Sequence, residues 1–241
     1  MTVMRQAADN TRIKVKTKKV KKIRAGITLL SFLTLFLHVS LLLSGCTDMS
    51  NRNPVVTFNL DPAASSGVGG SFSIELFPDK APNSVNFFIQ LVTEGYYDRI
   101  NVSQVNSGVS VVIGDLGYAK MNDRVIKGEF ADNGFTGNDV EFKRGTVGLM
   151  LEEGDPDSNY GDFFIVLSDE SGEELNGKYC AIGKITEGLE LLDEISLAKF
   201  YPGNHQPVYS IRTINAVVEL KGRSYPEEET QERTIYPGMH G

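Results

Sequence analysis

Residues that carry covalent or metal chemistry are scarce in this 241-residue chain. It has two cysteines, Cys46 and Cys180, with no spacing typical of a metal site or a disulfide framework. Of its three histidines, His38 lies in an apolar segment, His240 is one residue from the end, and no Gly-x-Ser-x-Gly turn accompanies His205. Nothing in the chain therefore supports a Ser–His–Asp hydrolase. We expect Cys180, within an apolar run, to be a buried and inert thiol rather than a nucleophile.

Positive charge is scarce after residue 45. Nine of the 24 lysines and arginines precede Cys46, together with a single acid, Asp9, which leaves 15 basic residues against 30 acidic ones in the remainder. A nucleic-acid-binding domain needs a basic footprint on its surface. The net charge of about −15 on the remainder therefore argues against nucleic acid as a partner.

The basic N-terminal block leads into one long hydrophobic run. Residues 25–44 contain no charged side chain. Twenty residues at roughly 1.5 Å per residue span about 30 Å, the hydrocarbon core of one bilayer. A positive segment before an apolar run is typical of an export signal, and an uncleaved membrane anchor is the alternative because the run is long. Both interpretations leave the acidic domain outside the cytoplasmic membrane.

The end of the run favours a cleaved and lipid-anchored protein. The sequence LSGC, ending at Cys46, resembles the lipobox of bacterial lipoprotein signal peptides. The resemblance implies a signal peptide over residues 1–45, lipid attachment at Cys46 and a polar tether over residues 46–53. Stable anchoring takes more than one acyl chain. We therefore expect the protein on the extracytoplasmic face of the bacterial cytoplasmic membrane, held there by its lipid.

Periodicity in the rest of the chain predicts a mainly β fold over residues 54–221. Segments that alternate with period two, or are short and apolar, are expected strands: residues 54–60, 71–77, two strands within 96–115, then 145–151, 162–167, 178–185 and 208–220. Two amphipathic helices are expected, the first capped by Asn83 or Ser84 and the second by Thr186. Many short strands with two helices predict a closed antiparallel β-barrel whose ends the helices cover. The polar, acidic residues 222–241 are expected to form a loose tail.

Four blocks of sequence, read in order, resemble the cyclophilin family of peptidyl-prolyl isomerases. The blocks are IELFPDKAPNSVNFFIQLVTEGYYD, IKGEF with DNGFTGN, RGTVGLML with DPDSNYGDFFIVL, and LNGKYCAIGKITEGLELLDEI. They cover about residues 54–220, and four ordered blocks are more specific than any single motif. The resemblance implies an eight-stranded cyclophilin-like barrel capped by two α-helices. It also implies an enzyme that assists protein folding by isomerising the peptide bonds that precede proline.

The resemblance assigns a substrate groove in which several residues differ from the family pattern. Where family members usually have Phe-His-Arg-Val, this chain has Val-Ser-Gln-Val, so Gln104 takes the place of the arginine that hydrogen-bonds the twisting prolyl amide. Val112 takes the place of a glutamine, and Val109 and Ser110 replace an apolar Phe-Met pair. We therefore expect weak or lost isomerase activity. The alternative is a non-catalytic peptide-binding scaffold or holdase on the same fold.

The remaining groove positions implied by the resemblance are apolar or aromatic. They are Met150, Leu151, Phe164, Leu175 and Tyr179. We expect proline-containing polypeptides as partners, and no cofactor. The segment from Asp155 to Gly161 resembles the start of a calcium-binding loop, but the glycine and the glutamate that such a loop needs are absent. We interpret this segment as a turn and expect no metal.

Overall fold

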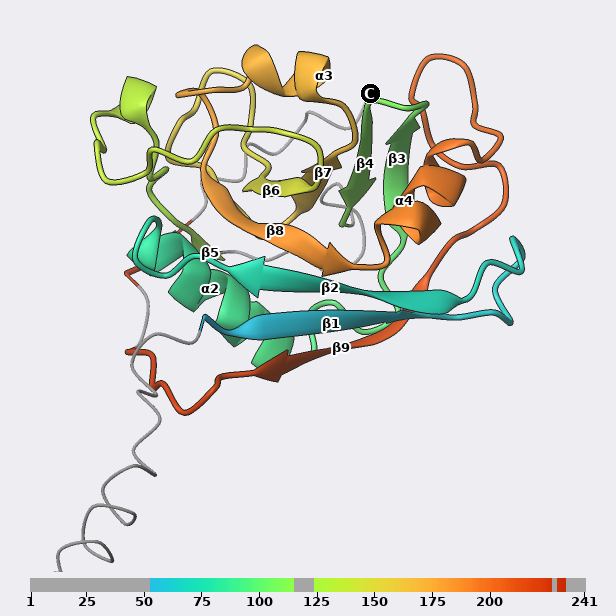
Figure 1. The fold of residues 1–241 in the computed structure, drawn as a ribbon, viewed down its shortest axis with the longest axis horizontal. Helices are drawn as coiled ribbons and strands as arrows, with labels where there is room; N and C mark the ends of the chain where they lie inside the picture. Colours follow the sequence, from blue (N-terminus) through green and yellow to red (C-terminus); the bar gives the residue numbers. More distant parts are fainter. Residues whose placement is uncertain (1–52, 115–123, 227–228, 233–241) are drawn as a thin grey trace, which may run out of the picture. The chain divides into compact units, whose positions relative to one another are not determined.

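The computed structural model describes residues 53–114, 124–226 and 229–232, and the predicted signal peptide and Cys46 lie outside them. Its main feature is one antiparallel sheet with the strand order β3-β4-β7-β6-β8-β2-β1-β9 (Figure 1). The strands are β1 (Val55–Leu60), β2 (Gly70–Leu76), β3 (Val102–Asn106), β4 (Ser110–Ile113), β6 (Thr146–Leu149), β7 (Phe163–Val166), β8 (Ala181–Glu187) and β9 (Thr213–Glu219). Each expected strand is thus present, so the mainly β prediction is confirmed.

The sheet curls into an open half-barrel, and the expected closed barrel with two helical caps is not confirmed. Among the described residues, the edge strands β3 and β9 approach each other only at adjoining ends, where Asn101 pairs with Arg212. The expected strand over residues 208–220 begins as late as Thr213. The preceding chain instead forms a loop along β3, where the Val105 amide donates to the His205 carbonyl at 2.9 Å.

Both expected helices exist, but neither begins with the predicted cap. Helix α2 (Pro82–Thr93) follows Ala81, which makes no side-chain capping bond. Helix α4 (Leu189–Ser196) follows Gly188 in a left-handed conformation, while Thr186 belongs to β8. A side chain at Gly188 would lie 2.5 Å from the backbone oxygen of Ser71, so glycine is required for this close approach of α4 to β2. A short third helix, α3 (Asp169–Glu173), was not expected.

The two faces of the sheet bury two separate apolar clusters. The larger cluster lies inside the curl and contains α2 and an aromatic group formed by Phe58, Phe72, Phe88, Tyr97 and Phe163. Because side chains alternate along a strand, Phe163 and Ile165 of β7 face this cluster, whereas Phe164 and Val166 face a smaller cluster on the other side. The smaller cluster forms the floor of the cavity described below.

Part of the C-terminal tail is docked on the domain, although the whole tail was expected to be loose. Strand β10 (Gln231–Glu232) pairs with β5 (Arg124–Val125). Nearby, Asn83 and Glu229 exchange two hydrogen bonds at 2.9 and 2.8 Å. In the described part of the chain, no helix has the length and apolar character to cross a membrane.

Candidate functional site

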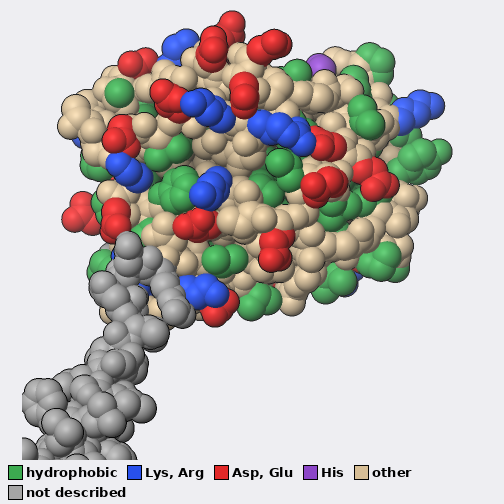
Figure 2. All heavy atoms as spheres, in the orientation of Figure 1, with side chains coloured by type: hydrophobic (Ala, Val, Ile, Leu, Met, Phe, Trp, Pro, Cys, Tyr) green, Lys and Arg blue, Asp and Glu red, His purple; other side chains and the backbone are tan. Residues whose placement is uncertain are grey.

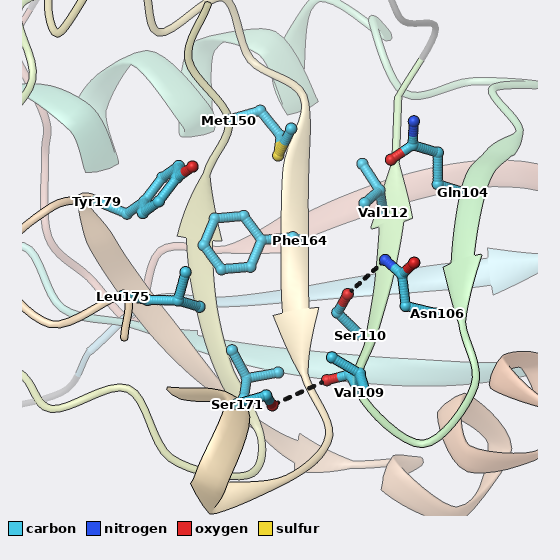
Figure 3. A pocket seen from close by; sticks show the side chains of 11 residues that line it. Gln104, Asn106, Val109, Ser110, Val112, Met150, Phe164, Ser171, Leu175 and Tyr179 are labelled. Atoms are coloured by element: carbon cyan, nitrogen blue, oxygen red, sulfur yellow. Dashed lines mark hydrogen bonds between the residues drawn. The ribbon is translucent and has the colours of Figure 1, made fainter. Parts of the chain in front are cut away.

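A cavity of about 220 Å³ lies on the outer face of the sheet, bordered by the β3–β4 hairpin, β7 and α3. It brings together the predicted groove residues Gln104, Val109, Ser110, Val112, Met150, Phe164, Leu175 and Tyr179 (Figure 3). Leu151 does not line the cavity. It follows Met150 and packs, partly buried, against the larger cluster, because neighbouring residues in extended chain face opposite sides. The cavity is smaller than the roughly 300–1,000 Å³ of sites for drug-sized ligands, so it suits one or two residues of a peptide.

The floor of the cavity is aromatic. Phe164 is 5% exposed. Its ring stacks on Phe142 at 5.6 Å and meets the edge of Tyr179 at 5.3 Å. Gly148 on β6 makes this arrangement possible, since a Cβ atom there would lie 2.5 Å from the Phe164 ring and 2.7 Å from the Phe142 ring. The floor is therefore a rigid apolar surface suited to a flat, apolar ring.

The opposite wall is polar and comes from the β3–β4 hairpin. Gln104 is paired with Val112, and Asn106 with Ser110, in the antiparallel register, and the pair Val105–Val111 lies between them. Asn106 Nδ2 donates a hydrogen bond to Ser110 Oγ at 3.0 Å (Figure 3). Within the described residues, the Gln104 side-chain amide makes no hydrogen bond. Its donor and acceptor are therefore available to a ligand in the cavity.

Helix α3 fixes the tip of this hairpin. Ser168 Oγ accepts the Ser171 amide at 3.2 Å and so caps the helix. Ser171 Oγ then donates to the Val109 carbonyl at 3.4 Å, and the Leu167 amide donates to the same oxygen at 2.8 Å. Asn106, Val166 and Ser171 also line the cavity, although none was predicted as a site residue. Asn106 lies two residues after Gln104, so strand alternation gives the signal that places both on one face.

Charged side chains lie beside the cavity, on the α3 side, and none of its described lining residues carries a charge. None of the described residues that line it is ionisable near neutral pH. Just outside, Glu170, Glu173 and Glu174 are exposed on α3 and the turn that follows it, and acidic side chains gather in that part of the surface (Figure 2). Asp162, before the two phenylalanines of β7, is fully buried and accepts a hydrogen bond from the Tyr96 hydroxyl at 3.1 Å. Its carboxylate therefore does not reach a ligand in the cavity.

Cys180 is a buried thiol, as predicted. It has no solvent exposure. Burial is the main reason why its pKa is raised to about 12. The thiol donates to Ser84 Oγ at 3.2 Å, and Asn138 Nδ2 approaches the sulfur at 3.7 Å. A protonated, inaccessible sulfur does not act as a nucleophile.

The segment from Asp155 to Gly161 is a turn. Asp155 Oδ1 accepts the Asp157 amide at 3.0 Å, and Asp157 Oδ1 accepts Asn133 Nδ2 at 2.7 Å. The Asp155 carboxylate thus closes the turn, and the Asp157 carboxylate holds it against the loop at Gly128 and Asn133. Over the described ranges, no group of three His, Cys, Asp or Glu side chains is arranged to hold a metal ion.

Comparison with known sequences places this domain in a widespread family. A family model described as cyclophilin type peptidyl-prolyl cis-trans isomerase/CLD matches residues 63–218. A probable peptidyl-prolyl cis-trans isomerase of Brucella suis biovar 1 (strain 1330) is 32% identical over 133 residues, which are 52% of this chain and 66% of the relative. Peptidyl-prolyl cis-trans isomerase CYP57 of Arabidopsis thaliana is 33% identical over 118 residues, 48% of this chain and 23% of the relative. The chain thus spans just under two thirds of the first relative and less of the second.

Solved structures share the fold. A cyclophilin type peptidyl-prolyl cis-trans isomerase of Cryptosporidium parvum, crystallised in the presence of the dipeptide Ala-Pro, superposes with a TM-score of 0.57 at 23% identity. That match covers 68% of this chain and 98% of the other. Cyclophilin AquaCyp293 of Hirschia baltica gives a TM-score of 0.52 at 19% identity, over 70% of this chain and 77% of the other.

Proposed function

The chain belongs to the cyclophilin-type peptidyl-prolyl cis-trans isomerase family, and on that basis we propose that its cavity binds proline-containing polypeptides and isomerises them slowly or not at all. In this proposal the proline ring lies on Phe164, between Leu175 and Tyr179. The adjoining peptide groups face Gln104. One observation carries the proposal: the cavity has an aromatic floor suited to a proline ring, but no positively charged side chain among its described lining residues.

The missing charge matters because of what a prolyl isomerase has to stabilise. Rotation about a peptide bond meets a barrier of roughly 18–20 kcal/mol, so uncatalysed isomerisation takes roughly 10–100 s. A catalyst must bind the twisted amide better than either planar form. In the family pattern an arginine donates charged hydrogen bonds to that amide, and we assign Gln104 to the arginine position. The loss of one preorganised donor typically costs about 2.7–4 kcal/mol, or roughly 100- to 1,000-fold in rate.

The test is prolyl isomerisation of a short proline peptide, measured by NMR exchange with the full chain purified in detergent. This measurement detects slow catalysts without a coupled protease. We expect the wild-type rate enhancement to be at least 100-fold below that of a family member that has the arginine. A wild-type rate equal to that of such an enzyme would contradict the proposal and make Gln104 an effective substitute.

Reversion of the substituted residues extends this test. Gln104→Arg alone is expected to recover little activity, because Val109, Ser110 and Val112 also differ and grouped catalytic residues act non-additively. The combination of Gln104→Arg, Val109→Phe, Ser110→Met and Val112→Gln is expected to recover measurable isomerisation. Full recovery by Gln104→Arg alone would show that the arginine is the one missing component.

A second candidate function is a non-catalytic module that holds proline-containing chains. The intact apolar floor and the neutral wall favour this function, since a ligand can bind without any group that stabilises a twisted amide. The same NMR experiment separates the two functions. Peptide binding without faster exchange supports the holding module, and faster exchange supports a weak enzyme.

We also propose that the domain works outside the cytoplasmic membrane, attached by lipid at Cys46. Support comes from the basic block, the apolar run and the LSGC sequence, which follow one another in the order of a lipoprotein signal peptide. Orientation follows the basic residues near the apolar run, which would leave the rest of the chain outside the cytoplasmic membrane. In this location the partners are exported polypeptides that are still folding.

A further inference from the structure

The cavity wall contains a polar pair whose hydrogen bonding the proposed function does not use. Asn106 and Ser110 face each other across β3 and β4, next to the pair formed by Gln104 and Val112. We propose that the Asn106–Ser110 pair determines specificity, selecting peptides in which an uncharged, hydrogen-bonding side chain adjoins the proline. The preferred side chains are those of Ser, Thr, Asn and Gln. This inference rests on the proposed binding of proline-containing peptides.

The pair leaves hydrogen-bonding capacity open to the cavity. Asn106 Nδ2 donates one hydrogen to Ser110 Oγ at 3.0 Å. The Asn106 amide oxygen and the Ser110 hydroxyl hydrogen then have no further partner among the described residues. An aliphatic ligand group pressed on these atoms would remove their water without replacing its hydrogen bonds, which is unfavourable. A ligand hydroxyl or amide group of similar shape restores the hydrogen bonds that the displaced water made.

The geometry places this pair beside the proline rather than beneath it. Figure 3 shows Asn106 and Ser110 on the hairpin side of the cavity and Phe164, Leu175 and Tyr179 on the other side. With a volume of about 220 Å³, the cavity holds one or two residues of a peptide, and a proline ring would occupy its floor. The wall is therefore left to the adjoining residue. That residue is uncharged, because an ionised group would lose water without meeting an opposite charge.

The pair is also held in place before any ligand arrives. Between the two strands, the Val109 amide donates to the Asn106 carbonyl at 2.8 Å and closes the hairpin turn. The Gly108 amide approaches Ser196 Oγ at 3.4 Å, and the Val105 amide is bonded to the loop at His205. A preorganised polar pair discriminates between ligands more sharply than a mobile one, because less ordering is needed on binding.

The test uses peptides that differ in polarity but hardly in shape. Binding of Thr–Pro and Val–Pro peptides, and of Asn–Pro and Leu–Pro peptides, is measured by NMR titration of the full chain in detergent. A second series places the same residues after the proline. In at least one series we expect the polar member of each pair to bind roughly three- to tenfold more tightly, the effect of one net hydrogen bond. Equal affinities within the pairs of both series would overturn the inference.

Variants assign the preference to the named side chains. Asn106→Leu with Ser110→Ala is expected to abolish the preference, and Ser110→Ala alone to reduce it if the double variant does not fold. The control is Asn59→Leu with Asn215→Leu, which removes a similar cross-strand pair on β1 and β9, bonded at 2.9 Å. The control should keep the wild-type preference.

Two further outcomes overturn the inference in different ways. A preference that survives Asn106→Leu with Ser110→Ala would show that other groups read the adjoining residue. Failure of every peptide to bind, including an unsubstituted Ala–Pro peptide, would overturn the proposed function together with the inference. Binding of all peptides with equal affinity would leave the proposed function standing.

Discussion

Phe164 has two roles at the scale of single residues. The sequence pattern predicted it as the floor of the groove, and the structure places it in a buried cluster with Phe142 that also lines the cavity. Replacement by alanine removes a packed aromatic side chain, and such changes cost about 3–5 kcal/mol of unfolding free energy. We expect Phe164→Ala to destabilise the domain by that amount.

Urea unfolding followed by circular dichroism measures this change, since the chain has no tryptophan to report by fluorescence. Val109→Ala is the control, because Val109 lines the same cavity but is 44% exposed. Surface changes of this kind usually stay within about 0.5 kcal/mol. A loss below about 1 kcal/mol for Phe164→Ala would show that the cluster is not important for stability.

Other residues show where prediction from the sequence stops. Gln104 and Ser110 were placed in the groove by the resemblance, and the structure places both on the face of the β3–β4 hairpin that lines the cavity. Leu151 packs against the larger cluster and does not line the cavity, since a resemblance in sequence blocks does not tell which of two adjacent residues faces the cavity. Ser171 was missed because it lies on the short α3, whose five residues show too little periodicity to predict a helix.

At the scale of elements, the N-terminus of α2 depends on a residue far along the chain. Glu129 is buried, and its carboxylate accepts hydrogen bonds from the amides of Asn83 and Ser84 at 3.2 and 2.8 Å and from Ser84 Oγ at 2.7 Å. The negative charge also lies at the positive end of the helix dipole. Glu129 therefore caps the N-terminus of α2, because the alanine at the N-cap position, Ala81, has no side-chain acceptor.

We expect Glu129→Ala to lower the unfolding free energy by about 1–3 kcal/mol, because it leaves buried amides without an acceptor. Glu173→Ala is the matched control, since Glu173 is an exposed glutamate without an ion-pair partner in the described part of the chain. The measurement is urea unfolding of the two variants under identical conditions. Equal stability of both would contradict a capping role for Glu129.

This tertiary cap explains why strands were predicted better than helix ends. Period-two alternation and short apolar runs are local signals, so β1, β2 and β7 could be read from a few residues each. The start of α2 is fixed by a carboxylate 45 residues beyond Ser84, and local capping rules do not contain that information. The pairing of β10 with β5 has the same long-range character.

At the scale of the whole molecule, the attachment to the membrane is the prediction with the largest consequence. Cys46→Ala removes the thiol that receives the lipid in our proposal. We expect the variant to lose labelling by a fatty-acid probe in cells, and to remain as the uncleaved precursor or to be released. Cys180→Ala is the control and should keep the label, since Cys180 is buried in the domain. An unlabelled wild-type protein with the mass of the full precursor would contradict the proposal.

The open edge of the sheet was also beyond the reach of the sequence. Eight strands were predicted, but whether they close depends on the path of the loop between α4 and β9. That loop follows β3 through the bond between Val105 and His205, and the edge strands meet near Asn101 and Arg212. Alternation predicts which residues lie inside a sheet and does not predict how its two edges meet.

The burial of Cys180 makes its reaction rate a measure of how often the domain opens. In a lipidated protein the sulfur of Cys46 is occupied, so Cys180 is the only thiol left for an alkylating reagent. With no exposure and a pKa of about 12, it reacts only during the moments when the surrounding structure opens. In the lipid-anchored form that we propose, the alkylation rate of Cys180 therefore reports how often the domain opens, without a dye, a tag or an extraction from the bilayer.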